Sequence, residues 1–285
     1  MAAIVLRSLT LSEKELQTLV TIIMDRNLNR EKPTNQYEFL RIKDGEIFLV
    51  AYKSGKLVHN DSAATRQILN EIVVHEQLYE YTVGTDETGK GEWYGPLVVV
   101  GIALTPEQIL NLRKMGTQDS KTLSQKRIQE IGQYLRRSSI IWDTRVLKPA
   151  SYNKMYAQFS SEGKSLNDIL AWAHTGIIND ILQKLEFKRA KVIIDKFDIR
   201  ATDLRLGKVK KFGVEVIQKS KGESEIPVAA ASVLAKLLFE DEVNFLNKKY
   251  AINLRTHEPR SIPREILPYV AKTHFKNVKE ALKTS

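Results

Sequence analysis

The chain has 285 residues, of which 42% are hydrophobic, enough to fill the cores of one large domain and one small one. Lys and Arg outnumber Asp and Glu by 44 to 34, which favours a polyanionic partner but also suits ordinary solubility. The absence of cysteine excludes disulfides, thiolate nucleophiles and Cys-ligated zinc, and it fits a reducing compartment. Since the sequence has neither a signal-peptide pattern nor an apolar run long enough to cross a membrane, we expect a cytoplasmic protein without a membrane partner.

Residues 1–78 are predicted to form a small α+β domain. Ser12 and Glu15 resemble a capping box, and apolar residues then recur at helical spacing up to about Arg30. Three short β-type runs and a second helix follow, at residues 37–42, 47–52, 56–59 and 61–75.

Residues 79–285 are predicted to form a larger α/β domain in which helices pack on a mixed sheet. The almost continuous apolar run at 96–104 suits a central strand that is buried on both faces. The other expected strands are residues 81–85, 140–147, 190–194 and 214–217, and the expected helices are 123–137, 166–185 and 228–245.

The densest chemical signal is the segment 84–91, Gly-Thr-Asp-Glu-Thr-Gly-Lys-Gly, at the end of a predicted strand. A phosphate-binding loop of the GxxxxGK[ST] type fails at Gly91, where a hydroxyl is needed. Adjacent acids can instead supply oxygen ligands to hard divalent cations, although a solvated acidic turn has the same composition. Because neighbouring side chains of a strand face opposite ways, we expect Glu87 to lie in the turn if it shares a site with Asp86.

Two further acids favour the cation site. Asp195 ends a short apolar strand, and three carboxylates meet if this strand neighbours the one before Asp86, although Asp195 can also cap the next segment. Glu240 lies on the polar side of a helix whose Ala-Ala-Ala-Ser start implies close packing on the sheet. An acid further along that helix can reach a sheet edge, yet Glu240 is also an ordinary surface acid.

Four blocks of sequence, in this order and at this spacing, resemble the motifs of the type 2 ribonucleases H; they are residues 84–101, 119–124, 195–197 and 227–236. The chain is similar to ribonuclease HIII in particular, because a small domain precedes the catalytic one, because the helix at 165–174 is typical of that group, and because the fourth acid is Glu240. Residues 51–56 resemble part of the TATA-binding-protein-like domain of the same enzymes.

This resemblance implies a ribonuclease-H-like mixed sheet flanked by helices at 79–285, preceded by a small substrate-binding, TATA-binding-protein-like domain at 1–78. It implies an endonuclease that hydrolyses the RNA strand of RNA/DNA hybrids and leaves a 5′-phosphate and a 3′-hydroxyl. Two Mg²⁺ or Mn²⁺ ions would be held by Asp86, Glu87, Asp195 and Glu240. A monomer is expected.

The resemblance also implies nucleic-acid contacts. Backbone amides of Gly89, Lys90 and Gly91 would meet phosphate and the 2′-hydroxyl, and Ser120 and Lys121 would contact backbone phosphates. A tight turn would equally explain the glycines at 89 and 91. A helix N-cap would equally explain the Asp-Ser-Lys sequence at 119–121.

Two other functions stay open at this point. Lys90 resembles the basic residue of the ribonuclease HII motif, which suggests incision at single ribonucleotides in DNA, and a non-catalytic nucleic-acid-binding protein would need the acids only for structure. His174 is interpreted as a satisfied core residue. Phe48 and Tyr52 share one face of a strand, which is either a hybrid-binding platform or the core side of the sheet.

Overall fold

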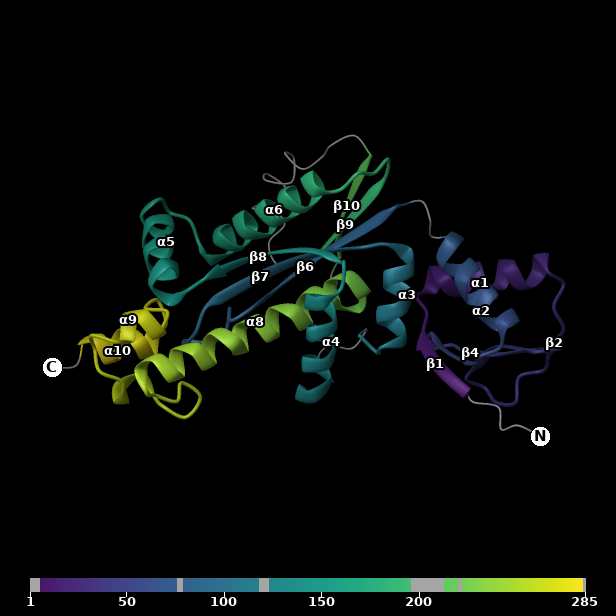
Figure 1. Cartoon of the computed structure of the whole chain (residues 1–285), viewed down its shortest axis with the longest axis horizontal. Coiled ribbons are helices and arrows are strands. Elements are labelled where there is room, and N and C mark those ends of the chain that lie inside the picture. Colours follow the sequence, from purple (N-terminus) through teal and green to yellow (C-terminus); the bar gives the residue numbers. More distant parts are fainter. Residues whose placement is uncertain (1–5, 76–78, 118–122, 196–212, 220–221, 284–285) are drawn as a thin grey trace. The chain divides into compact units, whose positions relative to one another are not determined.

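The computed structural model describes residues 6–75, 79–117, 123–195, 213–219 and 222–283 (Figure 1). These residues divide into two compact units. Unit 1 takes the described residues up to Glu80 together with 105–117, and unit 2 takes the rest. None of the described helices combines the length and the apolar character needed to cross a membrane.

Unit 1 is an antiparallel sheet with strand order β1-β5-β4-β3-β2 and helices packed on it. Its elements are β1 (Leu6–Thr10), α1 (Glu13–Asp25), β2 (Arg30–Glu31), β3 (Glu38–Asp44), β4 (Ile47–Tyr52), β5 (Lys56–Asn60), α2 (Ala63–His75) and α3 (Pro106–Lys114). The capping box at Ser12 and Glu15 is confirmed. The sequence predicted that this helix continues to about Arg30. Helix α1 instead ends at Asp25, because Asn27 adopts a left-handed conformation with φ of 50°.

The two faces of the unit 1 sheet differ in what covers them. Leu49 and Ala51 of β4 face the buried cluster that α1 and α2 complete. Strand alternation therefore turns Phe48 and Tyr52 to the opposite face, and both are partly exposed there. The interpretation that these aromatic residues lie on the core side of the sheet is therefore excluded.

Unit 2 contains the predicted mixed sheet, with strand order β10-β9-β6-β7-β8. Its strands are β6 (Tyr81–Thr88), β7 (Leu97–Leu104), β8 (Ile141–Leu147), β9 (Ala190–Asp195) and β10 (Val214–Lys219). Strands β6, β9 and β10 run parallel, whereas β6 with β7 and β7 with β8 are antiparallel. Every residue of β7 is buried, as its apolar sequence predicted.

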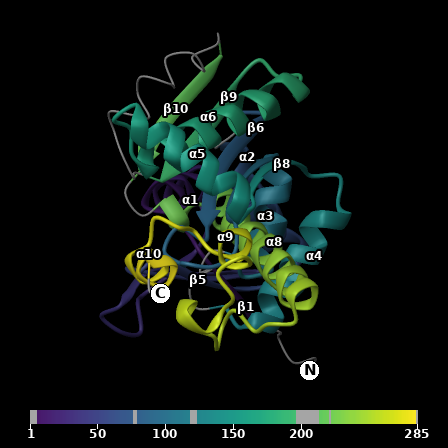
Figure 2. The ribbon, with the colours of Figure 1, turned by 90° about the vertical axis from the view of Figure 1, so that its left-hand side faces the viewer.

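Helices cover both faces of this sheet (Figures 1 and 2). Helix α6 (Leu166–Lys184) packs on β7 and β8, and α8 (Ile226–Tyr250) packs on β6 and β7 from the other face. The remaining described elements are α4 (Gln125–Arg137), α5 (Pro149–Ser161), η1 (Gly222–Ser224), η2 (Pro259–Ser261), α9 (Leu267–Val270) and α10 (Lys276–Lys283).

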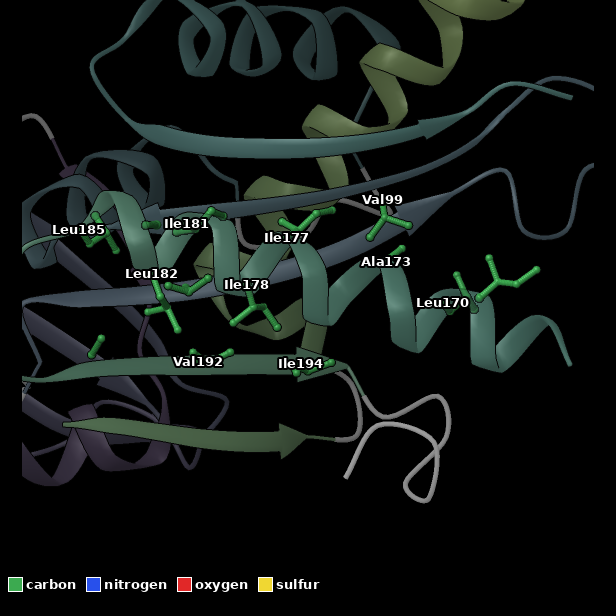
Figure 3. Packing of buried hydrophobic residues seen from close by; sticks show 14 of the residues in the cluster. Val99, Leu170, Ala173, Ile177, Ile178, Ile181, Leu182, Leu185, Val192 and Ile194 are labelled. Carbon is green, nitrogen blue, oxygen red and sulfur yellow. The ribbon is translucent and has the colours of Figure 1, made fainter. Parts of the chain in front are cut away.

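The core beneath α6 fixes the positions of the central strands. Ala173, Ile177 and Ile181 recur at helical spacing and are buried against the sheet (Figure 3). Val99 of β7 and Val192 of β9 belong to the same cluster, so one helix packs over strands on both sides of β6.

Helix α8 approaches the other face of β6 very closely. Its residues 229–231 are alanines without exposed surface. A Cβ atom on Gly84 would lie 2.3 Å from the carbonyl carbon of Pro227 and 2.4 Å from the nitrogen of Val228. The close packing that the Ala-Ser sequence predicted is therefore confirmed, and it requires glycine at position 84.

The Gly84→Ala variant is expected to lose about 1–3 kcal/mol of unfolding free energy, because backbone atoms have to move to admit the methyl group. Gly176→Ala is the matched control: it lies in α6, its Cβ would meet only Arg145 Nη2 at 4.0 Å, and alanine favours a helix. Denaturant unfolding of both variants measures the difference, and equal stabilities would contradict the packing described.

Candidate active site

Strand β6 continues through both acids of the Asp-Glu pair. Asp86 is paired with Val100 of β7, Glu87 with Val99 and Thr88 with Val98. The expectation that Glu87 lies in the turn is therefore wrong, because pairing with β7 holds it in regular strand geometry. Asp86 and Glu87 consequently face opposite sides of the sheet.

Asp86 faces helix α8, where the Ser232 hydroxyl donates a hydrogen bond to its carboxylate. Burial, and then the neighbouring charge of Glu87, raise the pKa of Asp86 to about 6. Within the described ranges, no Lys, Arg or His side chain forms an ion pair with Asp86. Among the residues that the structure describes, the site thus holds a partly buried carboxyl group without an ion-pair partner.

Glu87 faces helix α6, where His174 holds it. The imidazole Nε2 lies 3.2 Å from Glu87 Oε2, and Nδ1 lies 2.8 Å from Thr85 Oγ1. Lys90 Nζ is 3.6 Å from the other carboxylate oxygen. Burial by itself raises the pKa of Glu87, but His174 and Lys90 outweigh it and lower this pKa.

His174 is buried and satisfied, as expected, but its contact with Glu87 gives it a role that the sequence did not reveal. It is a positioning residue for one acid of the pair, as Ser232 is for the other. The only sequence signal for this role is a His among the apolar residues of a helix. That signal points to Glu87 only when it is known that α6 packs over β6.

Asp195 enters the site through strand pairing. Thr85 of β6 is in register with Ile194 of β9, and the two strands are parallel. The backbone of Asp195, one residue further along β9, therefore lies level with Asp86. The condition that these two strands are neighbours is therefore met. The Asp195 side chain, like Ser120 and Lys121, lies outside the described residues.

Glu240 is not brought to this pair. It forms an ion pair with Arg255, and its position on α8 is roughly 12 Å beyond Ser232 at 1.5 Å per helical residue. The other end of α8 lies closer to the pair, since a Cβ on Gly84 would meet Pro227 and Val228 there. Lys219 of β10 is in register with Asp195, and η1, which contains Glu223, follows three residues later and packs on β9.

The two glycines of the turn after β6 have different roles. Gly89 has φ of 93°, and a Cβ there would lie 2.1 Å from the carbonyl oxygen of Pro96. The fold itself therefore requires glycine at position 89. A Cβ on Gly91 would meet nothing within 4 Å, so packing does not explain this glycine, and the chain is open to a ligand there.

The donor set suits a hard divalent cation, because the charges of two adjacent acids act on each other and one of these acids forms no ion pair with a described residue. In the part of the chain that the structure describes, no group of three or more His, Cys, Asp or Glu side chains is placed to hold a metal ion. Asp86 and Glu87 therefore need a further ligand, and Asp195 is the acid that strand pairing brings level with them.

Comparisons with known proteins identify the family of the chain. The family model described as ribonuclease HII matches residues 83–278. Ribonuclease HIII of Chlamydia felis is 31% identical over 269 aligned residues, which cover 86% of this chain and 87% of that protein. Ribonuclease HIII of Oceanobacillus iheyensis is 29% identical and covers 90% and 93%.

Solved structures show the same fold. The crystal structure of Bst-RNase HIII in complex with Mn²⁺ matches with a TM-score of 0.64 and 22% identity, covering 98% of both chains. Ribonuclease H2 from Pyrococcus horikoshii matches with a TM-score of 0.58 and 21% identity, covering 71% of this chain and 97% of that one.

The fold and the strand-end acids define a nuclease of the ribonuclease H type. The chain belongs to the ribonuclease HII family and, within it, to ribonuclease HIII. It is accordingly an endoribonuclease with ribonuclease H activity.

Replacing Asp86 is expected to stabilise the metal-free protein at neutral pH. The folded-state pKa of Asp86, about 6, lies above its ordinary value of 3.8, so the folded state binds the proton more tightly. Wild-type stability should fall as the pH rises from about 4 to 6, and Asp86→Asn should remove that fall. The gain should be about 1–3 kcal/mol above pH 6, at about 1.4 kcal/mol per unit of pKa, and should vanish near pH 4.

Urea unfolding of both proteins in EDTA across this pH range gives the measurement. The same pH dependence in the variant and the wild type would contradict the description of Asp86 as a buried acid without a cation.

Proposed function

We propose that the chain is an endonuclease that hydrolyses the RNA strand of RNA/DNA hybrids and leaves a 5′-phosphate and a 3′-hydroxyl. The observation that carries this proposal is the parallel pairing of β6 with β9, which places the backbone of Asp195 level with Asp86 beside an open Gly-Lys-Gly turn. Residues 79–285 would form the catalytic domain and residues 1–78 a substrate-binding domain.

The carboxylates would hold two Mg²⁺ or Mn²⁺ ions, since hard cations of this size prefer anionic oxygens. When bound, such ions activate the attacking water and stabilise the leaving 3′ oxygen. Asp86, Glu87 and Asp195 are the ligands we propose. For a fourth acid, the topology supports Glu223, at the ends of β9 and β10, over Glu240, which pairs with Arg255.

The protein's own residues would orient the acids and the substrate. Ser232 and His174 hold the two acids from opposite faces of the sheet. The absence of a side chain at Gly91 leaves the backbone amides of residues 89–91 accessible to phosphate and to the 2′-hydroxyl that distinguishes RNA from DNA. Lys90, close to Glu87, would add positive charge beside the phosphate, and Ser120 and Lys121 would contact phosphates further along.

The open face of the unit 1 sheet would bind the hybrid. Phe39 is 48% exposed, and Arg41 lies over the Phe48 ring, 5.8 Å from its centroid. Arg41, Phe48 and Tyr52 share this face because strand alternation turns them away from α1 and α2. Phe39 lies at an irregularity of β3 and is outside the buried cluster that these helices complete. The guanidinium group of Arg41 is already paired with Glu38, so stacking of nucleotides on the aromatic rings is the contact we propose for this face.

Cleavage of a labelled hybrid should require Mg²⁺ or Mn²⁺, and Asp86→Asn should abolish cleavage while binding is retained. Because the proposal places Glu223 rather than Glu240 among the ligands, Glu223→Gln should lower cleavage at least about a hundredfold, the size of effect expected when a group that acts at the reacting centre is lost. Glu240→Gln should lower cleavage far less. If Glu240→Gln lowers cleavage more than Glu223→Gln does, Glu240 is the fourth ligand instead of Glu223. A wild-type protein that binds the hybrid but never cleaves it would contradict the proposed nuclease activity.

A second activity is favoured by Lys90, which lies 3.6 Å from Glu87 and resembles the basic residue of the ribonuclease HII motif. It is incision at a single ribonucleotide within DNA. Comparing a long hybrid with a duplex that carries one ribonucleotide separates the two activities. Cleavage of the second substrate at a similar rate would extend the proposed function.

Phe39→Ala is expected to raise KM for the hybrid about fivefold and to leave kcat unchanged, because loss of base stacking costs about 1 kcal/mol or more. Met24→Ala is the control, since Met24 is 60% exposed in the same unit but lies on α1, which packs on the other face of the sheet. Steady-state kinetics of both variants decide the matter. Equal KM values would remove this face from the substrate-binding surface.

A further inference from the structure

Lys272 is a buried lysine next to the turn of the candidate site. Only 1% of its surface is exposed. Its Nζ donates hydrogen bonds to the carbonyl oxygens of Glu92, at 3.0 Å, and Tyr94, at 2.9 Å. Its backbone N–H donates to the carbonyl of Trp93, at 2.7 Å. One residue therefore holds three successive carbonyl groups.

The neighbouring residues extend this contact without replacing it. Ala271 forms an antiparallel bridge with Tyr94, and the Gly95 N–H donates to the carbonyl of Val270 at 2.9 Å. Residues 92–94 lead directly from Gly91 into the segment before β7. The contacts of Lys272 thus fix the path by which the chain leaves the Gly-Lys-Gly turn.

The amine at this position is held by backbone carbonyl groups. Burying an ammonium group is costly, and burial lowers the pKa of Lys272 to about 7. Among the described residues, no Asp or Glu forms an ion pair with it, although the charge of Glu92 acts to raise its pKa, and the centroid of the Tyr152 ring is 5.9 Å away. An apolar side chain of similar length would avoid the cost of burying the amine, but it would leave the carbonyl groups of Glu92 and Tyr94 without this donor.

We propose that Lys272 is a positioning residue for substrate binding, which holds residues 92–94 so that the backbone amides of residues 89–91 point at the hybrid. The inference rests on the proposed function, because it assigns a structural support to the turn that function uses. Lys272 itself touches neither the candidate acids nor, on this account, the substrate.

Lys272→Met tests this role. The variant should fold, and its KM for the hybrid should rise about tenfold, equivalent to about 1.4 kcal/mol of binding free energy. Amide hydrogen exchange should accelerate at residues 89–95 in the free protein, which gives a readout without substrate. Lys283→Met, which removes the same charge from an exposed position on α10, should change KM by less than about twofold.

Chemical rescue separates the amine from the side-chain volume. The chain has no cysteine, so Lys272→Cys introduces a single thiol, which can be alkylated in denaturant before refolding. Aminoethylation recreates a lysine-like side chain and should restore both KM and slow exchange, whereas propylation, which adds the same length without the amine, should not.

Three results would overturn the inference: an unchanged KM in Lys272→Met, equal rescue by both alkylations, or a chain that folds only when the amine is present. Its failure is distinct from failure of the proposed function. If the wild type does not cleave hybrids, the function fails; if the wild type cleaves and Lys272→Met equals it in KM and exchange, only the role of Lys272 fails.

Discussion

The parallel pairing of β6 with β9 is the constraint on which the site depends. It brings Asp195 level with Asp86, although the two residues lie far apart in the sequence. The pairing is fixed by burial, since β7 and the apolar residues of β9 are buried and α6 and α8 pack on opposite faces of the sheet. Ligands in such sheets gather at the carboxyl ends of parallel strands, and the acids lie at those ends.

Regular strand geometry then determines how the acids are held. Because β6 continues through Thr88, Asp86 and Glu87 face different helices, and each helix supplies one partner. Ser232 of α8 holds Asp86, and His174 of α6 holds Glu87. Burial and the charge of Glu87 raise the pKa of Asp86, and a divalent cation bound to both acids, as we propose, would relieve the repulsion between them.

The sequence predicted those elements whose residues show a clear period. The bounds of β4, the buried β7 and the apolar stripe of α6 follow from alternation, continuous burial and helical spacing, respectively. Strand β1 was missed because only one of its five residues is buried, and α9 was missed because four residues are too few for a pattern. The predicted position of Glu87 in the turn was wrong, because the sequence of a strand does not show which residues it pairs with. Side-chain partners are hidden in the same way: Glu240 pairs with Arg255 beyond the end of its helix, and Lys272 contacts residues 92–94 in a distant part of the chain.

Anomalous diffraction from crystals soaked in Mn²⁺ tests the central claim most directly, because it locates the metal independently of any assay. The account predicts Mn²⁺ at the ends of β6 and β9, with carboxylate oxygens of Asp86, Glu87 and Asp195 about 2.0–2.3 Å from the ions, the range for hard divalent cations. Anomalous peaks found only beside Glu240 or elsewhere on the surface, with no metal ion at Asp86, would contradict this prediction.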